Sequence, residues 1–183
     1  MQNPCPCGGF LYSSCCAPLH RGECQAATAE QLMRSRYSAY ALGEVEYLLQ
    51  TQPSPVPLAR RRRELLASLG QLHWQRLQIL AVTAGAPHDL SGTVTFEAHY
   101  FAAGQRGVMR ECSLFGREGH SLDGGWLYLE ALELACPWFI GASRVSASRF
   151  SASRVSADRP SGAGESHPGP GQRRDDTPPH APC

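Results

Sequence analysis

The stretch Pro4-Cys5-Pro6-Cys7-Gly8-Gly9, followed by Cys15-Cys16, decides the fold. It places four of the chain's eight cysteines within twelve residues. Zinc binds four thiolates in a tetrahedron, and a structural site of this kind leaves no open position for water. Gly8 and Gly9 let the backbone turn back on itself, as a short chelating loop requires. We therefore predict one Zn²⁺ ion ligated by Cys5, Cys7, Cys15 and Cys16.

Disulfide bonds are the competing interpretation of the same cysteines. A bond between Cys15 and Cys16 would be strained, because disulfides need a well-defined separation and orientation of the two residues. The segment Met1–Pro4 carries no basic residue and no apolar segment follows it, so we expect no export. Without export, a cysteine cluster more often binds metal than forms disulfides. His20 follows Cys16 closely, and its replacement of one thiolate is left open.

Three helices are predicted after the cysteine loop. Residues 28–31 form a capping box with Thr28 as the N-cap, and apolar and aromatic residues then recur at helical spacing up to Tyr40. A second helix is expected over residues 44–51 and a third over residues 58–69. The third helix places four leucines on one face, namely Leu58, Leu65, Leu66 and Leu69.

The period of the apolar pattern then changes to two, which is typical of strands. In the first of these strands the alternation places Trp74 on the face opposite to Leu77. The clearest strand covers residues 93–101, and one of its faces consists of Val94, Phe96, Ala98 and Tyr100. A hairpin turn at residues 104–107 and two more strands, 108–117 and 126–132, follow. Helices followed by antiparallel strands predict an α+β fold, with the helices packed on a curved antiparallel sheet.

The cysteine loop is similar to the SEC-C motif, a short zinc loop also found at the tail of the SecA translocase. Further residues resemble the YchJ-like family of bacterial proteins, namely Cys5-Pro6-Cys7-Gly8, Tyr12, Cys15-Cys16, Thr28-Ala29-Glu30 and the run Leu32–Tyr40. Trp126-Leu127-Tyr128 extend the resemblance, which stops near Glu130. The resemblance implies the cone-shaped fold of nuclear transport factor two, in which a curved sheet wraps a helix-lined pocket.

We divide the chain into a zinc loop (residues 1–24), a cone-shaped α+β domain (25–135) and a tail (136–183). The tail is rich in Pro, Gly and charged residues and is expected to be disordered. Residues 143–157 contain three copies of Ser-Arg-Val/Phe-Ser-Ala. A frameshifted reading frame and a Ser/Arg tail that contacts RNA are both left open.

The composition restricts the classes of partner. The formal net charge is +1, so no global field favours nucleic acid or an acidic ligand. No apolar run approaches the roughly 20 residues needed to span a bilayer, and we expect a soluble, cytoplasmic protein with no membrane contact. A solvated helix face and an anionic partner are both compatible with the four consecutive arginines, Arg60, Arg61, Arg62 and Arg63.

Two functional hypotheses follow. In the first, the protein is a zinc-stabilised binding or adaptor module without turnover, which contacts protein or nucleic acid through its zinc loop and its arginines. In the second, it is a small-molecule enzyme or carrier that uses the pocket of the cone, with His99 and Glu111 as the polar pair. Glu97, Ser113 and Tyr128 are further candidates on its sheet. A closed set of four thiolates offers no catalytic water, so we favour the first hypothesis and lean against an enzyme.

Overall fold

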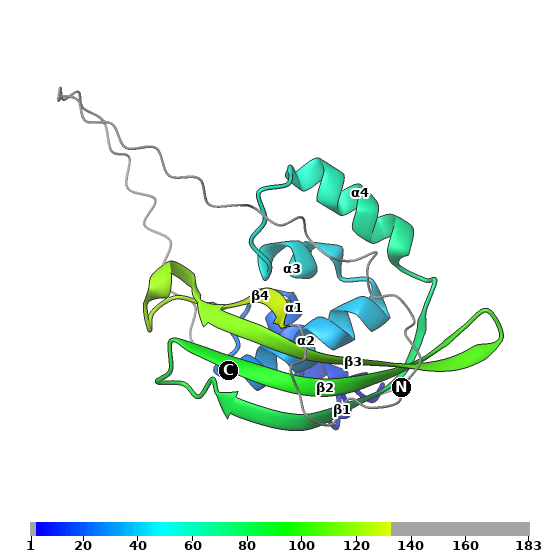
Figure 1. Cartoon of the computed structure of the whole chain (residues 1–183), viewed down its shortest axis with the longest axis horizontal. Helices are drawn as coiled ribbons and strands as arrows, with labels where there is room; N and C mark the ends of the chain where they lie inside the picture. The colour runs from blue at the N-terminus through cyan, green and yellow to red at the C-terminus, as the bar shows by residue number, and fades with distance from the viewer. Residues whose placement is uncertain (1–2, 133–183) are drawn as a thin grey trace. The chain divides into compact units, whose positions relative to one another are not determined.

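Residues 3–132, which the computed structural model describes, form one antiparallel sheet with helices on one side of it (Figure 1). The longest helix, α2 (Ala29–Leu42), packs against the sheet. The strands follow the chain order in the sheet, and they are β1 (His73–Ala84), β2 (Ser91–Ala102), β3 (Gln105–Arg117) and β4 (Trp126–Leu132). This arrangement confirms the predicted α+β fold class.

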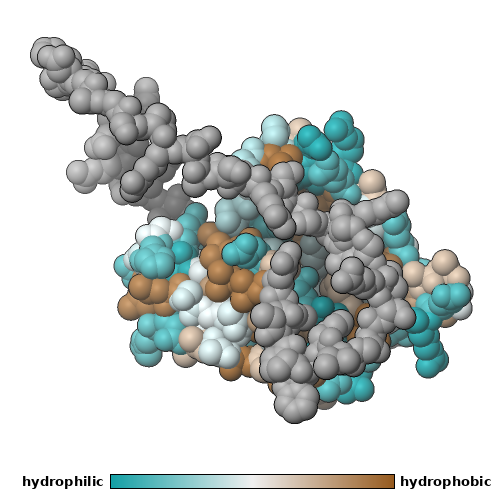
Figure 2. Space-filling model, in the orientation of Figure 1, coloured by the Kyte–Doolittle hydropathy of each residue, from teal (hydrophilic) through white to brown (hydrophobic). Residues whose placement is uncertain are grey.

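The remaining helices are short and lie in two places. Within the cysteine loop they are η1 (Tyr12–Ser14) and α1 (Ala17–His20). After α2 they are α3 (Val45–Gln50), α4 (Leu58–Ser68) and the 3-10 turn η2 (Glu118–His120). Helix α4 packs on α3 and has no fully buried residue, and Figure 2 shows hydrophilic side chains over it. The predicted leucine face is therefore only partly correct: Leu65 packs against the core, whereas Leu58 and Leu66 are exposed.

Helix α2 begins at the residue that its sequence predicts. The hydroxyl of Thr28 accepts a hydrogen bond from the backbone N–H of Gln31 at 3.0 Å, so Thr28 is the N-cap. The side chain of Gln31 accepts in return from the N–H of Ala27, one residue before the cap, at 2.7 Å. Gly43 ends the helix in the left-handed conformation, with φ of 82°.

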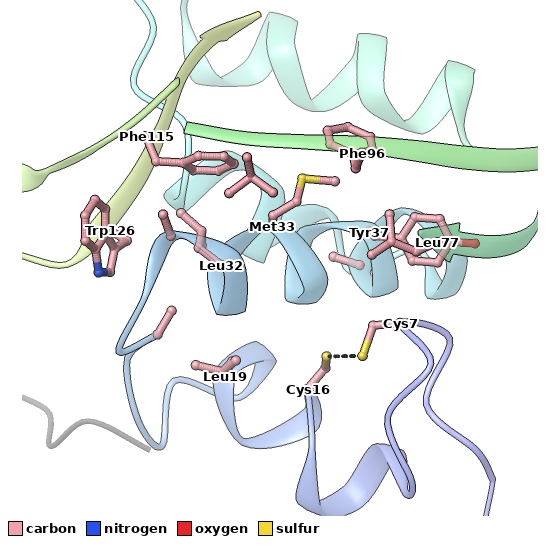
Figure 3. Close-up of a cluster of buried hydrophobic side chains, with 14 of the residues drawn as sticks. Cys7, Cys16, Leu19, Leu32, Met33, Tyr37, Leu77, Phe96, Phe115 and Trp126 are labelled. Carbon is pink, nitrogen blue, oxygen red and sulfur yellow. Dashed lines mark hydrogen bonds between the residues drawn. The ribbon is translucent and has the colours of Figure 1, made fainter. Parts of the chain in front are cut away.

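Helix α2 is buried on two opposite sides. On one side Leu32 and Met33 point toward Phe96 and Phe115 of the sheet (Figure 3). On the other side the helix faces the cysteine loop, which contributes Cys7 to the same continuous core (Figure 3). The helix therefore joins the loop to the sheet.

The hairpin between β2 and β3 turns earlier than its sequence suggests. Ala103 and Gly104 both have positive φ, of 49° and 79°, as a two-residue hairpin turn of type I′ requires. Gly107 belongs to β3 instead of the turn, and a Cβ atom there would lie 2.4 Å from the ring of Tyr100. The turn is thus the pair 103–104, and the prediction of residues 104–107 is wrong.

A bulge in β1 changes the face of its tryptophan. Trp74 pairs with Tyr100 and Arg76 pairs with His99, so one extra residue lies between the two pairs. The ring of Trp74 packs 5.6 Å from that of Tyr37, on the helix side with Leu77. The predicted separation of Trp74 from Leu77 is wrong because simple alternation does not anticipate the bulge.

Among residues 3–132, no helix is long and apolar enough to cross a membrane. The expected disorder of the tail and its Ser/Arg repeats concern residues outside this range.

Candidate metal centre

The four cysteines of the loop converge on one point. Their Sγ atoms all lie within 4.8 Å of one another. Cys7 Sγ lies 3.4 Å from Cys5, 3.5 Å from Cys15 and 3.7 Å from Cys16, and the last two sulfurs are 3.8 Å apart. Four sulfurs at about 2.3 Å from one zinc ion form a tetrahedron with edges of about 3.8 Å. The distances fit this tetrahedron and are too long for a disulfide, whose S–S bond is about 2.05 Å.

Glycine is required at Gly9 to close the loop. A Cβ atom on Gly9 would lie 2.6 Å from the Sγ of Cys15, so a larger residue would displace a ligand. Gly8 has φ of 89°, and its N–H donates to the carbonyl of Cys5 at 3.0 Å. This tight turn brings Cys5 and Cys7 to the same side of the loop.

Polar side chains of α2 surround the sulfurs. The hydroxyl of Ser38, which is fully buried, lies 3.6 Å from Cys5 Sγ. Arg34 donates to the carbonyl of Cys7 at 3.1 Å and to the carboxylate of Glu30 at 2.8 Å. The arginine near the cluster is thus Arg34, whereas Arg21 forms an exposed ion pair with Glu23.

The contacts among the thiols shift their pKa values in opposite directions. A hydrogen bond from Cys16 lowers the pKa of Cys7 to about 4, and the backbone N–H of Gly9 acts in the same direction. Burial raises the pKa of Cys15 to about 12, and the contact with Cys7 raises the pKa of Cys16 still further above its ordinary value. At neutral pH the metal-free cluster therefore holds protons on Cys15 and Cys16, which a cation bound by all four sulfurs must displace.

Both ring nitrogens of His20 are engaged away from the sulfurs. Nε2 donates to the carbonyl of Ser35 at 2.9 Å, and Nδ1 lies 2.9 Å from the hydroxyl of Tyr12. Burial lowers the pKa of His20, which favours the neutral ring. His20 thus links Tyr12 of the loop to α2, and it lies outside the group of four sulfurs.

The structure does not bring His99 and Glu111 together. Glu111 pairs with Phe96 and His99 pairs with Val108, so the two side chains lie on opposite faces of the sheet. His99 lies on the face away from the helices, 3.8 Å from Glu97. The pairing of His99 with Glu111 in the second hypothesis is wrong for this reason.

The inner candidates form a closed hydrogen-bond network. Glu111 accepts from the hydroxyl of Ser113 at 2.7 Å and from that of Tyr128 at 3.2 Å. The guanidinium of Arg36 lies 4.8 Å from the ring centre of Tyr128 and donates to Thr51 at 2.7 Å. Apolar side chains, including Leu32 and Met33, lie between α2 and the sheet (Figure 3).

The arginines of α4 are largely occupied within the molecule. Arg60 pairs with Glu64, and Arg62 pairs with Glu46. Arg61 donates to the carbonyl of Gln52 at 2.6 Å. These contacts favour a solvated helix face over an anion-binding surface.

Ser38 and Phe10 were not identified as site residues from the sequence, and neither was the contact of Arg34 with the cysteine loop. Ser38 and Arg34 contact the cysteine loop from α2, but this helix also carries Glu30, Gln31 and Arg36, so polarity alone does not distinguish them in the sequence. Phe10 is 87% exposed at the rim of a cavity of about 500 Å³ beside the cluster. This cavity is also lined by Leu11, Cys15, Pro18, Leu19 and Arg34.

A four-cysteine loop fixed to a helix that packs on an antiparallel sheet places the chain among α+β proteins with an N-terminal cysteine cluster that could hold a metal ion. Residues 28–131 match the family model described as YchJ, middle NTF2-like domain. The chain belongs to this YchJ-like family, whose relatives carry the name UPF0225. The match ends where the predicted resemblance ends, near Glu130.

Individual relatives support this assignment. A UPF0225 protein of Corynebacterium glutamicum is 42% identical over 129 residues, covering 70% of this chain and 95% of the relative. The solution structure of a SEC-C motif containing protein from Rhodopseudomonas palustris has a TM-score of 0.57 at 28% identity, over 72% of this chain and 98% of that one. A crystal structure of such a protein from Psychrobacter arcticus has a TM-score of 0.56 at 26% identity, over 70% and 81%.

Proposed function

We propose that the protein is a zinc-dependent adaptor that binds a protein partner through its cysteine loop and does not catalyse a reaction. The observation that carries this proposal is the closed set of four sulfurs, with separations that match tetrahedral zinc. Such a set leaves no coordination position for water or substrate, so the ion has a structural role.

The surface beside the metal centre supports a role in binding. Phe10 is the most exposed large hydrophobic residue among those described, and it borders the cavity lined by Leu11 and Pro18. Exposed aromatic residues next to a concave apolar surface are typical of protein contacts. The bound metal would fix this loop and thereby present Phe10 in one orientation.

Nucleic acid is the less favoured partner. Arg60, Arg61 and Arg62 are all engaged within the molecule. Exchanging these contacts for phosphates would cost part of the electrostatic gain on which nucleic-acid binding depends.

The test combines metal analysis with capture of partners from a native lysate. The wild-type protein should contain one zinc per chain, and Cys5→Ser should lose both the zinc and the captured protein. Phe10→Ala should keep the zinc but weaken capture by about 2 kcal/mol, the size of a binding hot spot. Phe101→Ala, which removes an aromatic residue that is 40% exposed elsewhere, is the matched control and should capture normally. Capture that survives both Cys5→Ser and Phe10→Ala would contradict the proposal.

A further inference from the structure

Cys15 differs from the other three cysteines of the cluster in its access to solvent. Cys5, Cys7 and Cys16 are only 4%, 1% and 2% exposed. Cys15 and Cys16 both line the surface cavity beside Phe10, but only Cys15 is partly exposed. Cys15 is therefore the most exposed cysteine of the cluster, and the oxidation of cysteines follows thiolate character and exposure.

Cys7 is the most favourable partner for Cys15 in an oxidised site. The two Sγ atoms are 3.5 Å apart. Cys16 is 3.8 Å from Cys15 but adjacent to it in sequence, where a disulfide is strained. The loop between Cys7 and Cys15 contains two glycines, so it can adjust to an S–S bond of about 2.05 Å.

We propose that Cys15 is the oxidation site of the metal centre, and that a peroxide joins Cys7 and Cys15 in a disulfide that releases the bound ion. This inference rests on the zinc site of the proposed function. The Cys15 thiolate attacks the O–O bond of the peroxide and becomes a sulfenic acid, and hydroxide (or alkoxide) leaves. The Cys7 thiolate then attacks the sulfenic sulfur, the S–S bond forms, and a second hydroxide leaves.

The scheme transfers two electrons and removes two of the four sulfur ligands. The two sulfurs lose two electrons, and the two peroxide oxygens gain them. Cys5 and Cys16 remain as half of the original ligand set, which no longer retains the ion. Without the ion the loop that carries Phe10 would no longer be fixed by its four sulfurs, so peroxide would control the adaptor surface.

The first test uses the full-length, zinc-loaded wild-type protein with hydrogen peroxide. Zinc release is followed with a chromogenic chelator, and the mass of the denatured, metal-free chain should be about 2 Da lower after oxidation, because one disulfide forms. Chymotrypsin cleaves between Cys7 and Cys15, after Phe10 or Tyr12, so mapping identifies the bridge. A Cys7–Cys15 bridge is expected. A Cys5–Cys7 or Cys15–Cys16 bridge, or zinc that stays bound, would overturn the inference.

Two histidine variants test the role of Cys15 while offering a replacement ligand for zinc. After zinc content is verified, Cys15→His should release zinc at least ~10-fold more slowly than the wild type, because it lacks the accessible thiolate. Cys16→His keeps both Cys7 and Cys15 and should differ by less than about twofold. Equal slowing in both variants would overturn the inference.

A measurement on the wild type alone covers the case in which neither variant retains zinc. Limiting N-ethylmaleimide should modify Cys15 before the other three cluster cysteines, and a different first site would overturn the inference. A wild-type protein purified without zinc would contradict the proposed function itself. A zinc-loaded protein with a different bridge would contradict only the role of Cys15.

Discussion

The two sides of helix α2 are held by different kinds of interaction. On the sheet side, Met33 packs against Phe96 in a continuous apolar core (Figure 3). On the loop side, Leu19 joins this core, and the other contacts are four clustered sulfurs and polar bonds from Arg34 and Ser38. Packed apolar side chains stabilise a fold by themselves, whereas a short loop around thiols depends on the ion that they bind. We therefore predict that the sheet side stays folded without a metal ion, whereas the loop side does not.

Removal of the metal should have the largest effect, and this effect should be confined to the loop side. A strong chelator, or Cys7→Ser, should abolish hydrogen-exchange protection of loop amides such as Gly8 while β2 and β3 stay protected. The reason is that, among residues 3–24, Leu19 is the one large apolar side chain that is buried, and the other buried contacts are mainly those of the cysteines. Loss of hydrogen-exchange protection in both the loop and the sheet would contradict this prediction.

Truncation in the sheet core should give the next largest effect. Phe115 is fully buried and packs against the ring of Tyr128 at 5.8 Å. Phe115→Ala should lower the free energy of unfolding by about 3–5 kcal/mol. Urea denaturation measures this loss, and zinc content at low denaturant should remain normal if the loop side is separately stabilised.

Acidification should act mainly on the loop side. In the metal-free cluster, burial raises the pKa of Cys15 to about 12, and contact with Cys7 raises the pKa of Cys16 still further. Both thiols therefore hold protons at neutral pH, and binding must release at least these two. Zinc affinity should fall by about 100-fold or more per pH unit as the pH is lowered from 8 to 6. Competition titrations with a chelator measure this slope, and a flat profile would show that no protons are displaced.

Removing a side chain next to the sulfurs should have a smaller effect on the same affinity. Ser38→Ala deletes the hydroxyl that lies 3.6 Å from Cys5 Sγ. Loss of such an outer contact typically weakens metal binding by about 10-fold or more. Ser14→Ala, which removes an exposed hydroxyl of the loop, is the control and should leave the affinity unchanged.

The smallest effect should come from the cap that begins α2. Thr28→Ala removes the hydrogen bond to the N–H of Gln31 and should cost about 1 kcal/mol of stability. Since α2 supports both sides, both the urea midpoint and the temperature of zinc release should fall slightly. A change in only one of the two would mean that the helix does not couple them.

The sequence predicted correctly those features that are determined within one short segment of the chain. The spacing of Cys5, Cys7, Cys15 and Cys16 gave the sulfur cluster, and Thr28 gave the start of α2, because each depends on a short segment. The alternation from Val94 to Tyr100 correctly identified the inner face of β2.

Features that depend on register between strands were not predicted. A hairpin loop with an even number of residues places odd-numbered residues of β2 opposite even-numbered residues of β3. His99 and Glu111 therefore lie on opposite faces, whatever their individual chemistry. The bulge that turns Trp74 inward depends on its aromatic neighbours Tyr37 and Tyr100, which lie far away in the sequence.

The most direct test of the central claim is the composition of the metal site in the purified wild-type protein. Elemental analysis should give one zinc per chain, and X-ray absorption at the zinc edge should give four sulfur neighbours at about 2.3 Å. A protein without zinc, a site with nitrogen in place of one sulfur, or disulfides among Cys5, Cys7, Cys15 and Cys16 would contradict the account.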